Sequence, residues 1–191
     1  MADNKATTIH KDVNQFSVAP NLLDYDKTYK AFSWEKAEKE QVSFFEDGKL
    51  NIAYNCIDRH ALSNKKNKKA LLFEGANGEK ETYTFAELKK LTDQFANVLH
   101  DHSIVRGDRV FIFLPPIPER YVAFLGVLKM GAIAGTLFAA FQEQALRDRL
   151  ADSEAKVVIT NAILYPRIEK IWNDLPHLER VILVERGGVE H

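Results

Sequence analysis

The spacing of hydrophobic residues changes along this chain, and its first third differs from the rest. Up to about residue 20 the chain is polar, with few bulky apolar residues, which is typical of a flexible arm. Between Asp24 and Lys39, Tyr25, Tyr29 and Phe32 recur at helical spacing and predict a short amphipathic helix laid on a larger body. A second short helix is predicted at residues 51–62. We therefore expect a flexible arm over residues 1–20 and a helical cap segment over residues 21–69.

A hairpin and a long helix are predicted from residue 70 onward. Residues 70–74 and 81–83 are expected to form two short strands, joined by a turn with Asn-Gly chemistry. Thr84 and Glu87 then match the capping box, in which each side chain satisfies a free backbone N–H at the start of a helix. This helix is expected to end near Ser103. Its apolar stripe consists of Leu88, Leu91, Phe95, Val98 and Leu99.

The remaining sequence alternates between apolar runs of strand length and helical segments. Strands are predicted at residues 109–114, 132–137, 156–160 and 180–185, and such apolar runs are typical of strands buried on both faces. Helices are predicted at residues 118–130, at residues 145–150 and in a segment ending near Trp172. Pro118 and Pro166 suit the first turns of two of these helices, where a missing N–H leaves no hydrogen bond unmade.

This alternation predicts an α/β fold with a mostly parallel sheet and flanking helices, because right-handed crossovers connect successive parallel strands. In the helix at residues 118–130, the side chains expected on one side are Tyr121, Phe124, Leu125 and Leu128. Residues 70–191 form the α/β part, which follows the helical segment.

Composition and charge narrow the class of protein. Of the 191 residues, 46% are hydrophobic and 28% charged, and the formal net charge is −1, so no overall field favours nucleic acid or an anionic membrane. No apolar stretch is long enough for a membrane span. The lysine-rich run at residues 65–69 lacks interleaved aromatic residues and is expected to be a solvated loop. The single cysteine, Cys56, excludes an internal disulfide and is expected to be a small buried thiol, so we expect a cytoplasmic protein.

Familiar site motifs are missing from the sequence. Neither G-x-G-x-x-G nor G-x-x-x-x-G-K-[ST] occurs, and the strand at residues 109–114 is followed by prolines, which have no N–H to donate to a phosphate. No G-x-S-x-G motif is present. Of the six histidines only His100 and His102 are close together, and residues two apart on a helix diverge. From the residues alone we expect an α/β domain with an unassigned site and no metal ligands.

Five stretches, in order and in register over about residues 22–184, resemble the acetyl-CoA synthetase branch of the AMP-forming acyl-CoA synthetases. The first is the most specific, because it distinguishes the acetyl and propionyl branch from most of the superfamily. The stretches are G-K-L-N-I-A-Y-N-C-I-D-R-H at 48–60, Y-T-F-A-E-L at 83–88, G-D-R-V at 107–110 with L-P and P-E following, K-M-G-A-I at 129–133, and R-L-A-D-S-E-A-K-V-V-I-T at 149–160.

The resemblance implies a fold and a reaction. The fold is the N-terminal subdomain of the adenylate-forming enzymes. The intact enzymes join acetate to ATP as an acetyl-adenylate with release of diphosphate, and then transfer the acetyl group to the thiol of CoA. ATP, Mg and CoA are thus the cofactors and substrates implied for the intact family.

The sequence differs from this family chiefly by its length. The phosphate loop, the acidic adenine- and Mg-associated motifs, the hinge and the catalytic lysine of the family have no counterpart up to His191. Without donors and cations around the triphosphate, the charge that moves during adenylation is not stabilised. We therefore expect no catalytic residue, no bound cofactor and no ligase activity of this chain by itself.

The resemblance points to one set of candidate site residues, Phe138, Ala139, Ala140 and Phe141. The matching segment of the family often reads Phe-Gly-Gly-Phe and lies near the path of the CoA pantetheine. In this chain two alanines replace the glycines, and their methyl groups reduce the space for a ligand close to the backbone. Packing at the end of a strand is the alternative role of this segment.

Three hypotheses for the whole chain remain open. The first is the N-terminal part of an acetate–CoA ligase, and the second is a non-catalytic module that docks to a separately encoded remainder or to another synthetase chain. The third is a free-standing α/β binding protein with another ligand. A part of a larger enzyme should expose apolar surface at the sheet edge after Glu185, whereas a self-sufficient module should have polar residues there.

Overall fold

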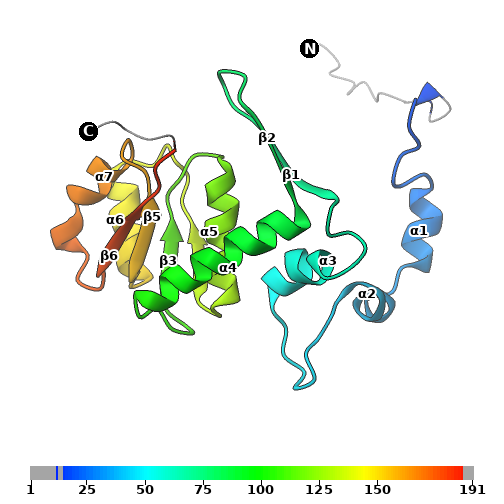
Figure 1. The fold of residues 1–191 in the computed structure, drawn as a ribbon, viewed down its shortest axis with the longest axis horizontal. Helices are drawn as coiled ribbons and strands as arrows, with labels where there is room; N and C mark the ends of the chain where they lie inside the picture. Colours follow the sequence, from blue (N-terminus) through cyan, green and yellow to red (C-terminus); the bar gives the residue numbers. More distant parts are fainter. Residues whose placement is uncertain (1–11, 13–14, 187–191) are drawn as a thin grey trace, which may run out of the picture. The chain divides into compact units, whose positions relative to one another are not determined.

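The computed structural model describes residue 12 and residues 15–186 (Figure 1). They belong to two compact units, and the boundary in the sequence lies between Ser43 and Phe44. The N-terminal unit contains α1 (Tyr25–Ala31) and α2 (Trp34–Gln41). Asp24 and Ser33 cap these helices, because their side chains accept backbone N–H groups at the first turn. The chain thus forms two short helices where the sequence predicted one, since the backbone is extended at the cap residue Ser33.

The N-terminal unit has no core of its own in the described residues. Neither helix contains a buried residue. The exposed large apolar side chains of this unit are Phe16, Val18, Leu22, Leu23, Tyr25, Tyr29, Phe32 and Trp34. Most of the flexible arm predicted for residues 1–20 lies outside the described residues, and the predicted domain boundaries at residues 20 and 69 stay predictions.

The second unit is built on a four-stranded parallel sheet with the order β4-β3-β5-β6. Val110 of β3 lies opposite Ala134 of β4 and Val157 of β5, and Val158 lies opposite Val181 of β6. The strands are β3 (Arg109–Ile112), β4 (Ile133–Thr136), β5 (Val157–Thr160) and β6 (Arg180–Leu183). The predicted α/β class with a parallel sheet is confirmed.

Helices cover both faces of this sheet (Figure 1). On one face, α4 (Phe85–Asp101) and α5 (Pro118–Lys129) pack on strand residues such as Ile112 and Ile159. On the other face, α6 (Glu143–Asp152) and α7 (Tyr165–Glu169), followed by the short helix η3 (Trp172–Asp174), pack on Phe113 and Val158. Successive strand residues therefore enter opposite cores, which explains why these strands are apolar throughout.

Several local predictions are confirmed. Thr84 and Glu87 form the predicted capping box at the start of α4. Pro118 and Pro166 lie in the first turns of α5 and α7. The predicted hairpin consists of β1 (Lys69–Glu74) and β2 (Lys80–Thr84), which pair antiparallel. The lysine-rich run at residues 65–69 is exposed, as predicted.

The predicted apolar stripes of α4 and α5 are partly wrong. Thr92 and Ala96 are buried on α4, whereas Val98 is exposed, and Ala123 rather than Tyr121 enters the core from α5. The reason is a close crossing of the two helices at Gly126. A Cβ atom there would lie 2.8 Å from the ring of Phe95 and 3.3 Å from the carbonyl oxygen of Thr92. Small residues therefore occupy the contact between α4 and α5, and larger side chains lie at the edges of this contact.

Residues 52–61 form the second predicted short helix, which is wound as a π-helix, η2, over Tyr54–Asp58 and ends in α3 (Arg59–Ala61). Ala53 and Ile57 are its buried residues. The prediction that Cys56 is a buried thiol is wrong. Cys56 precedes Ile57 on the helix and is therefore exposed when Ile57 faces the core.

Gly135 of β4 provides a test of the packing in the sheet. A Cβ atom at this position would meet the ring of Phe111, its partner on β3. We expect Gly135→Ala to lower the free energy of unfolding by about 1–2 kcal/mol. The overpacking against the Phe111 ring destabilises the fold by more than the reduced conformational entropy of the unfolded chain stabilises it. Urea unfolding followed by circular dichroism measures this. In a Phe111→Leu background the same substitution should have a much smaller effect, and an equal effect in both backgrounds would contradict the predicted contact.

Candidate functional site

The carboxyl ends of the strands meet at one edge of the sheet, here called the carboxyl edge. From β3 the chain passes first to β4 on one side of β3 and then to β5 on the other. Ligands of open α/β sheets bind at such a switch in strand order, outside the carboxyl ends. Between β3 and β5 this edge is closed by Thr160, whose buried hydroxyl donates to the carbonyl oxygen of Phe113 at 2.8 Å.

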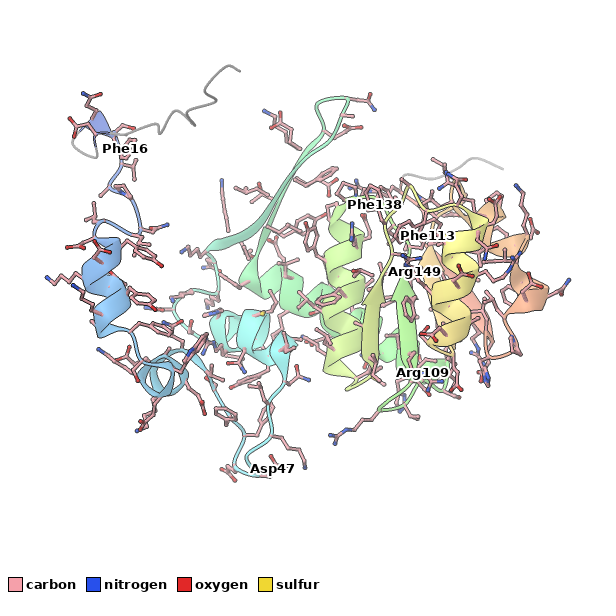
Figure 2. The ribbon with its side chains drawn as sticks, turned by 180° about the vertical axis from the view of Figure 1, so that it is seen from behind. Phe16, Asp47, Arg109, Phe113, Phe138 and Arg149 are labelled. Atoms are coloured by element: carbon pink, nitrogen blue, oxygen red, sulfur yellow. The ribbon has the colours of Figure 1, made fainter. Side chains whose placement is uncertain are left out.

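The four predicted site residues form a turn at this edge, directly after β4. Its ends are joined by a hydrogen bond of 2.9 Å from the N–H of Phe141 to the carbonyl oxygen of Phe138. Phe138 is 65% exposed, and its ring meets that of Phe141 edge-on with the centroids 5.9 Å apart. In Figure 2, Phe138 lies at the opposite end of the sheet from Arg109, where β3 begins.

The alanines of this turn have different environments. Ala139 packs against the core formed with α6 and α7, whereas Ala140 is exposed. Neither has a positive φ, so the backbone of the turn does not require glycine at these positions. Of the two methyl groups, only that of Ala140 therefore reduces the space for a ligand that approaches the backbone of the turn from solvent.

Two arginines, Arg167 and Arg149, hold this turn. One terminal nitrogen, Nη1, of Arg167 at α7 donates to the carbonyl oxygens of Ala139 at 2.8 Å and Phe141 at 3.0 Å. The guanidinium carbon of Arg149 on α6 lies 4.4 Å from the centroid of the Phe141 ring. Sequence reasoning assigned neither residue to the site, because their positions relative to the turn depend on how α6 and α7 pack. Arg149 begins the matched stretch at residues 149–160, but nothing in that stretch indicates a contact with Phe141.

A second cluster lies around Arg186, just after β6. Its guanidinium pairs with Glu81 of β2 and with Glu119 of α5, the latter at 3.0 Å, and lies 4.9 Å from the ring centroid of Phe73. The hydroxyl of Tyr83 donates to Glu81. Partial burial and this hydrogen bond raise the pKa of Tyr83 to about 12, so the phenol stays neutral near pH 7 and cannot serve as a base.

The described residues around the carboxyl edge offer few of the groups that phosphate or metal sites use. The turn after β3 contains Pro115, Pro116 and Pro118, which have no N–H to donate. Within residues 15–186 no group of three or more His, Cys, Asp and Glu side chains is arranged to hold a metal ion. His100 and His102 are exposed, and Nδ1 of His102 lies 2.7 Å from Arg180. In the described chain no helix is long and apolar enough to cross a membrane.

A groove of about 910 Å³ lies elsewhere, beside the amino ends of the strands. Residues 45–52 form one side of it, and Arg106 and residues 128–132 form the other. It is an open groove with both charged and apolar residues, and none of the turn residues 138–141 lines it. We place the candidate site at the carboxyl edge, because the switch in strand order and the matched turn coincide there.

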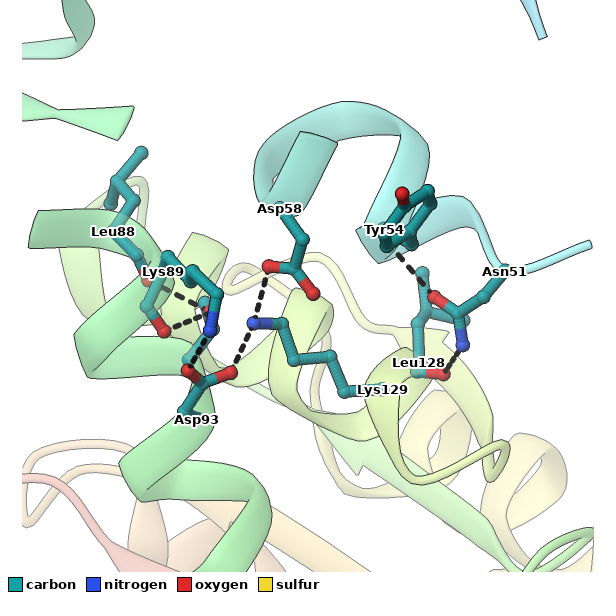
Figure 3. A network of polar contacts seen from close by, with 9 residues as sticks. Asn51, Tyr54, Asp58, Leu88, Lys89, Asp93, Leu128 and Lys129 are labelled. Atoms are coloured by element: carbon teal, nitrogen blue, oxygen red, sulfur yellow. Dashed lines mark hydrogen bonds and ion pairs between the residues drawn. The ribbon is translucent and has the colours of Figure 1, made fainter. Parts of the chain in front are cut away.

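Lys129 anchors the helical segment 52–61 to the α/β part (Figure 3). Its ammonium group lies 2.6 Å from Asp58 and 2.5 Å from Asp93 of α4, and its side chain is only 10% exposed. Lys89 also pairs with Asp93, at 2.6 Å. Beside this cluster the side chain of Asn51 donates to the carbonyl oxygen of Leu128 at 2.8 Å. Three segments far apart in the sequence thus meet at one cation.

This network sets the protonation of Asp93. Partial burial raises the pKa of this carboxyl, but the hydrogen bonds from Lys129 and Lys89 outweigh it and hold the pKa below its ordinary value of 3.8. A carboxyl with a lowered pKa in the folded state stabilises the fold fully above its unfolded pKa. That contribution is lost as the pH falls through the folded pKa.

We therefore expect Lys129→Met to lower the free energy of unfolding by about 2–3 kcal/mol at pH 7, because two carboxylates lose their shared partner. The variant should also lose less stability than the unaltered chain as the pH falls below 3.8, since Asp93 then keeps only Lys89 of the two cations that lower its pKa. Urea unfolding across this pH range measures both effects. Lys170→Met is the matched control, because Lys170 pairs with Glu143 in an exposed position. Equal effects of the two substitutions would contradict the anchoring role.

Comparisons with known proteins agree with this architecture. The AMP-binding enzyme family matches residues 57–191. The chain is 50% identical over 169 residues to the acetyl-coenzyme A synthetase of Bacillus subtilis, which covers 88% of this chain and 28% of the relative. For acetyl-coenzyme A synthetase 2 of Candida glabrata the identity is 36%, and the match covers 90% of this chain and 26% of the relative.

Similarity to a solved structure supports the same conclusion. The crystal structure of an acyl-CoA synthetase from Brucella canis matches with a TM-score of 0.71 and 28% identity, over 87% of this chain and 30% of that one. The chain thus spans little more than a quarter of the length of the curated relatives it matches. On the sequence motifs, the fold and these matches, the chain belongs to the AMP-binding enzyme family and corresponds to the N-terminal portion of its acetyl-CoA synthetases.

Proposed function

We propose that this chain supplies the N-terminal α/β part of an acetate–CoA ligase and acts only in combination with the remaining family motifs. In the assembled enzyme acetate, ATP and CoA would give acetyl-CoA, AMP and diphosphate, with Mg assisting at the phosphates. The observation that carries this proposal is the 50% identity to an acetyl-coenzyme A synthetase over 88% of this chain. By itself the chain is expected to be inactive.

Adenylation explains why the remaining family motifs are needed. A carboxylate is a poor electrophile, and bonding to AMP gives its carbon a leaving group. Negative charge moves onto the departing diphosphate in this step, so donors and cations must surround the phosphates. At the described carboxyl edge the segment after β3 contains prolines without N–H groups, and the arginines there already pair with Glu119 or with the turn, so they do not meet that need.

The role proposed for the turn at residues 138–141 is to form part of the wall along which the pantetheine arm of CoA lies. Its position after β4, at the carboxyl edge of the sheet, supports this role, as does the exposed ring of Phe138. An aromatic face and free backbone groups suit an arm made of alkyl and amide units. The chain would thus contribute to thioester formation more than to adenylation.

The open edge of β6 offers a surface on which the remainder of the enzyme can pack. Among the described strands β6 pairs only with β5, so its other edge offers unpaired N–H and C=O groups. Leu183 on this strand is 44% exposed. The partner is expected to cover this edge, as the sequence predicted for part of a larger enzyme.

The test is an assay of acetate- and CoA-dependent diphosphate release with this chain alone and with the remainder of the Bacillus subtilis acetyl-coenzyme A synthetase. We expect no release by the chain alone and release by the mixture, because only the mixture surrounds the phosphates of ATP. Activity of the chain alone would contradict the proposal. Silence of the mixture would instead favour a binding protein that has kept only the scaffold.

The sheet edge provides a second test in the same assay. Leu183→Asp is expected to raise the concentration of partner needed for half-maximal activity by about tenfold, because a charge at a buried edge is desolvated. Leu62→Asp is the matched control, since Leu62 is 71% exposed and lies directly after α3, far from β6 in sequence. An equal loss in both variants would show that β6 is not the docking edge.

A further inference from the structure

We infer that Arg167 is the positioning residue that sets the shape of the turn at residues 138–141 for CoA. This inference rests on the proposed function, because it concerns the same turn. It goes further in assigning a role to a side chain of α7, which lies outside the matched motifs. The argument starts from the hydrogen bonds of the turn.

Every carbonyl group of the turn has a donor within the protein. The carbonyl oxygen of Phe138 accepts from the N–H of Phe141, and that of Ala140 accepts from the side chain of Gln142 at 3.2 Å. The carbonyl oxygens of Ala139 and Phe141 both accept from Arg167. A single side chain therefore satisfies two of the four carbonyl groups and fixes their directions relative to each other.

The N–H groups of Ala139 and Ala140, in contrast, have no acceptor in the described part of the chain. With the carbonyl groups held by Arg167, Gln142 and the Phe141 N–H, these two consecutive N–H groups at the tip of the turn are free to donate to a ligand, and the N–H of Phe138 likewise has no acceptor in the described residues. A ligand with amide or thioester carbonyl groups matches them, and the pantetheine arm of CoA contains such groups. Arg167 thus keeps the turn in the form in which it can donate to that arm.

Arg167 itself is held firmly. It lies next to Ile168, which is fully buried in the core against the sheet. The start of α7 is fixed by Asn161, whose side-chain oxygen accepts the N–H of Leu164 at 2.9 Å. Among the described residues Arg167 lies within ion-pair distance of no acidic side chain, so its hydrogen bonds go to the carbonyl groups of the turn, although its charge also helps to lower the pKa of Glu143. Its planar guanidinium is suited to this bridging, whereas a lysine would provide a point charge.

Phe141 is held from a second side. Its ring packs against the core and is covered by the guanidinium of Arg149. The turn is therefore fixed at its last residue by two arginines from two helices. Phe138, at its first residue, remains exposed and available to a bound molecule.

The experiment compares Arg167→Met, Arg167→Lys and the control Lys170→Met in the mixed assay described above. Lys170 lies three residues further along the chain and pairs with Glu143 rather than with the turn. We expect Arg167→Met to raise the KM for CoA about tenfold, because a misplaced turn loses its contacts with the arm. The rate of acetate-dependent ATP–diphosphate exchange, which reports adenylation alone, should stay unchanged. Arg167→Lys should restore part of the loss, and Lys170→Met should resemble the unaltered chain.

Other results would overturn the inference. An unchanged KM for CoA would show that Arg167 does not position the turn for CoA, and an equal fall of both half-reactions would show a merely structural role. A mixture that is inactive even with the unaltered chain would contradict the proposed function instead. In that case amide hydrogen exchange of the chain alone decides the positioning role. Arg167→Met should speed exchange of the Phe141 N–H about tenfold relative to Lys170→Met, and equal exchange would refute it.

Discussion

The parallel pairing of β3 with β5 is the contact on which the rest of the second unit depends. The two strands are central in the order β4-β3-β5-β6, although β4 lies between them in the sequence. The pair continues beyond the ladder, because the N–H of Phe113 donates to Ile159 at 2.8 Å and Thr160 donates back to Phe113. Thr160 is the polar residue that closes this junction, and a buried hydroxyl without such a partner would destabilise the fold.

This junction determines where a ligand site can form. Because the chain leaves β3 toward one side and β5 toward the other, the turn after β4 and the start of α7 are brought to the same edge of the sheet. The hydrogen bonds from Arg167 to the turn at residues 138–141 follow from that arrangement. The packing of α7 thus places the guanidinium of Arg167, in the segment after β5, beside the turn that follows β4. The anchoring network at Lys129 has a different role, since it attaches the segment before β1 to α4 and α5.

Much of the fold could be predicted from the sequence, because it is specified locally. The capping box of Thr84 and Glu87, the prolines at helix starts and the apolar strands all depend on neighbouring residues. The predictions that failed depend on packing between elements. Val98 was expected in the core, but the close crossing at Gly126 buries Thr92 and Ala96 instead, and the exposure of Cys56 follows from which side of its helix meets the body. For the site, the matched motif identified the turn, whereas Arg167 and Arg149 come from helices whose positions only the folded chain reveals.

The central proposal is that this α/β part forms a ligase only in combination with the remaining motifs of the family. The most direct measurement is sedimentation of the chain mixed with the remainder of the Bacillus subtilis acetyl-coenzyme A synthetase, without substrates. The account predicts a one-to-one complex, because the open edge of β6 is expected to be covered by the remainder of the enzyme. Independent sedimentation of the two polypeptides at concentrations well above those of the activity assay would contradict it.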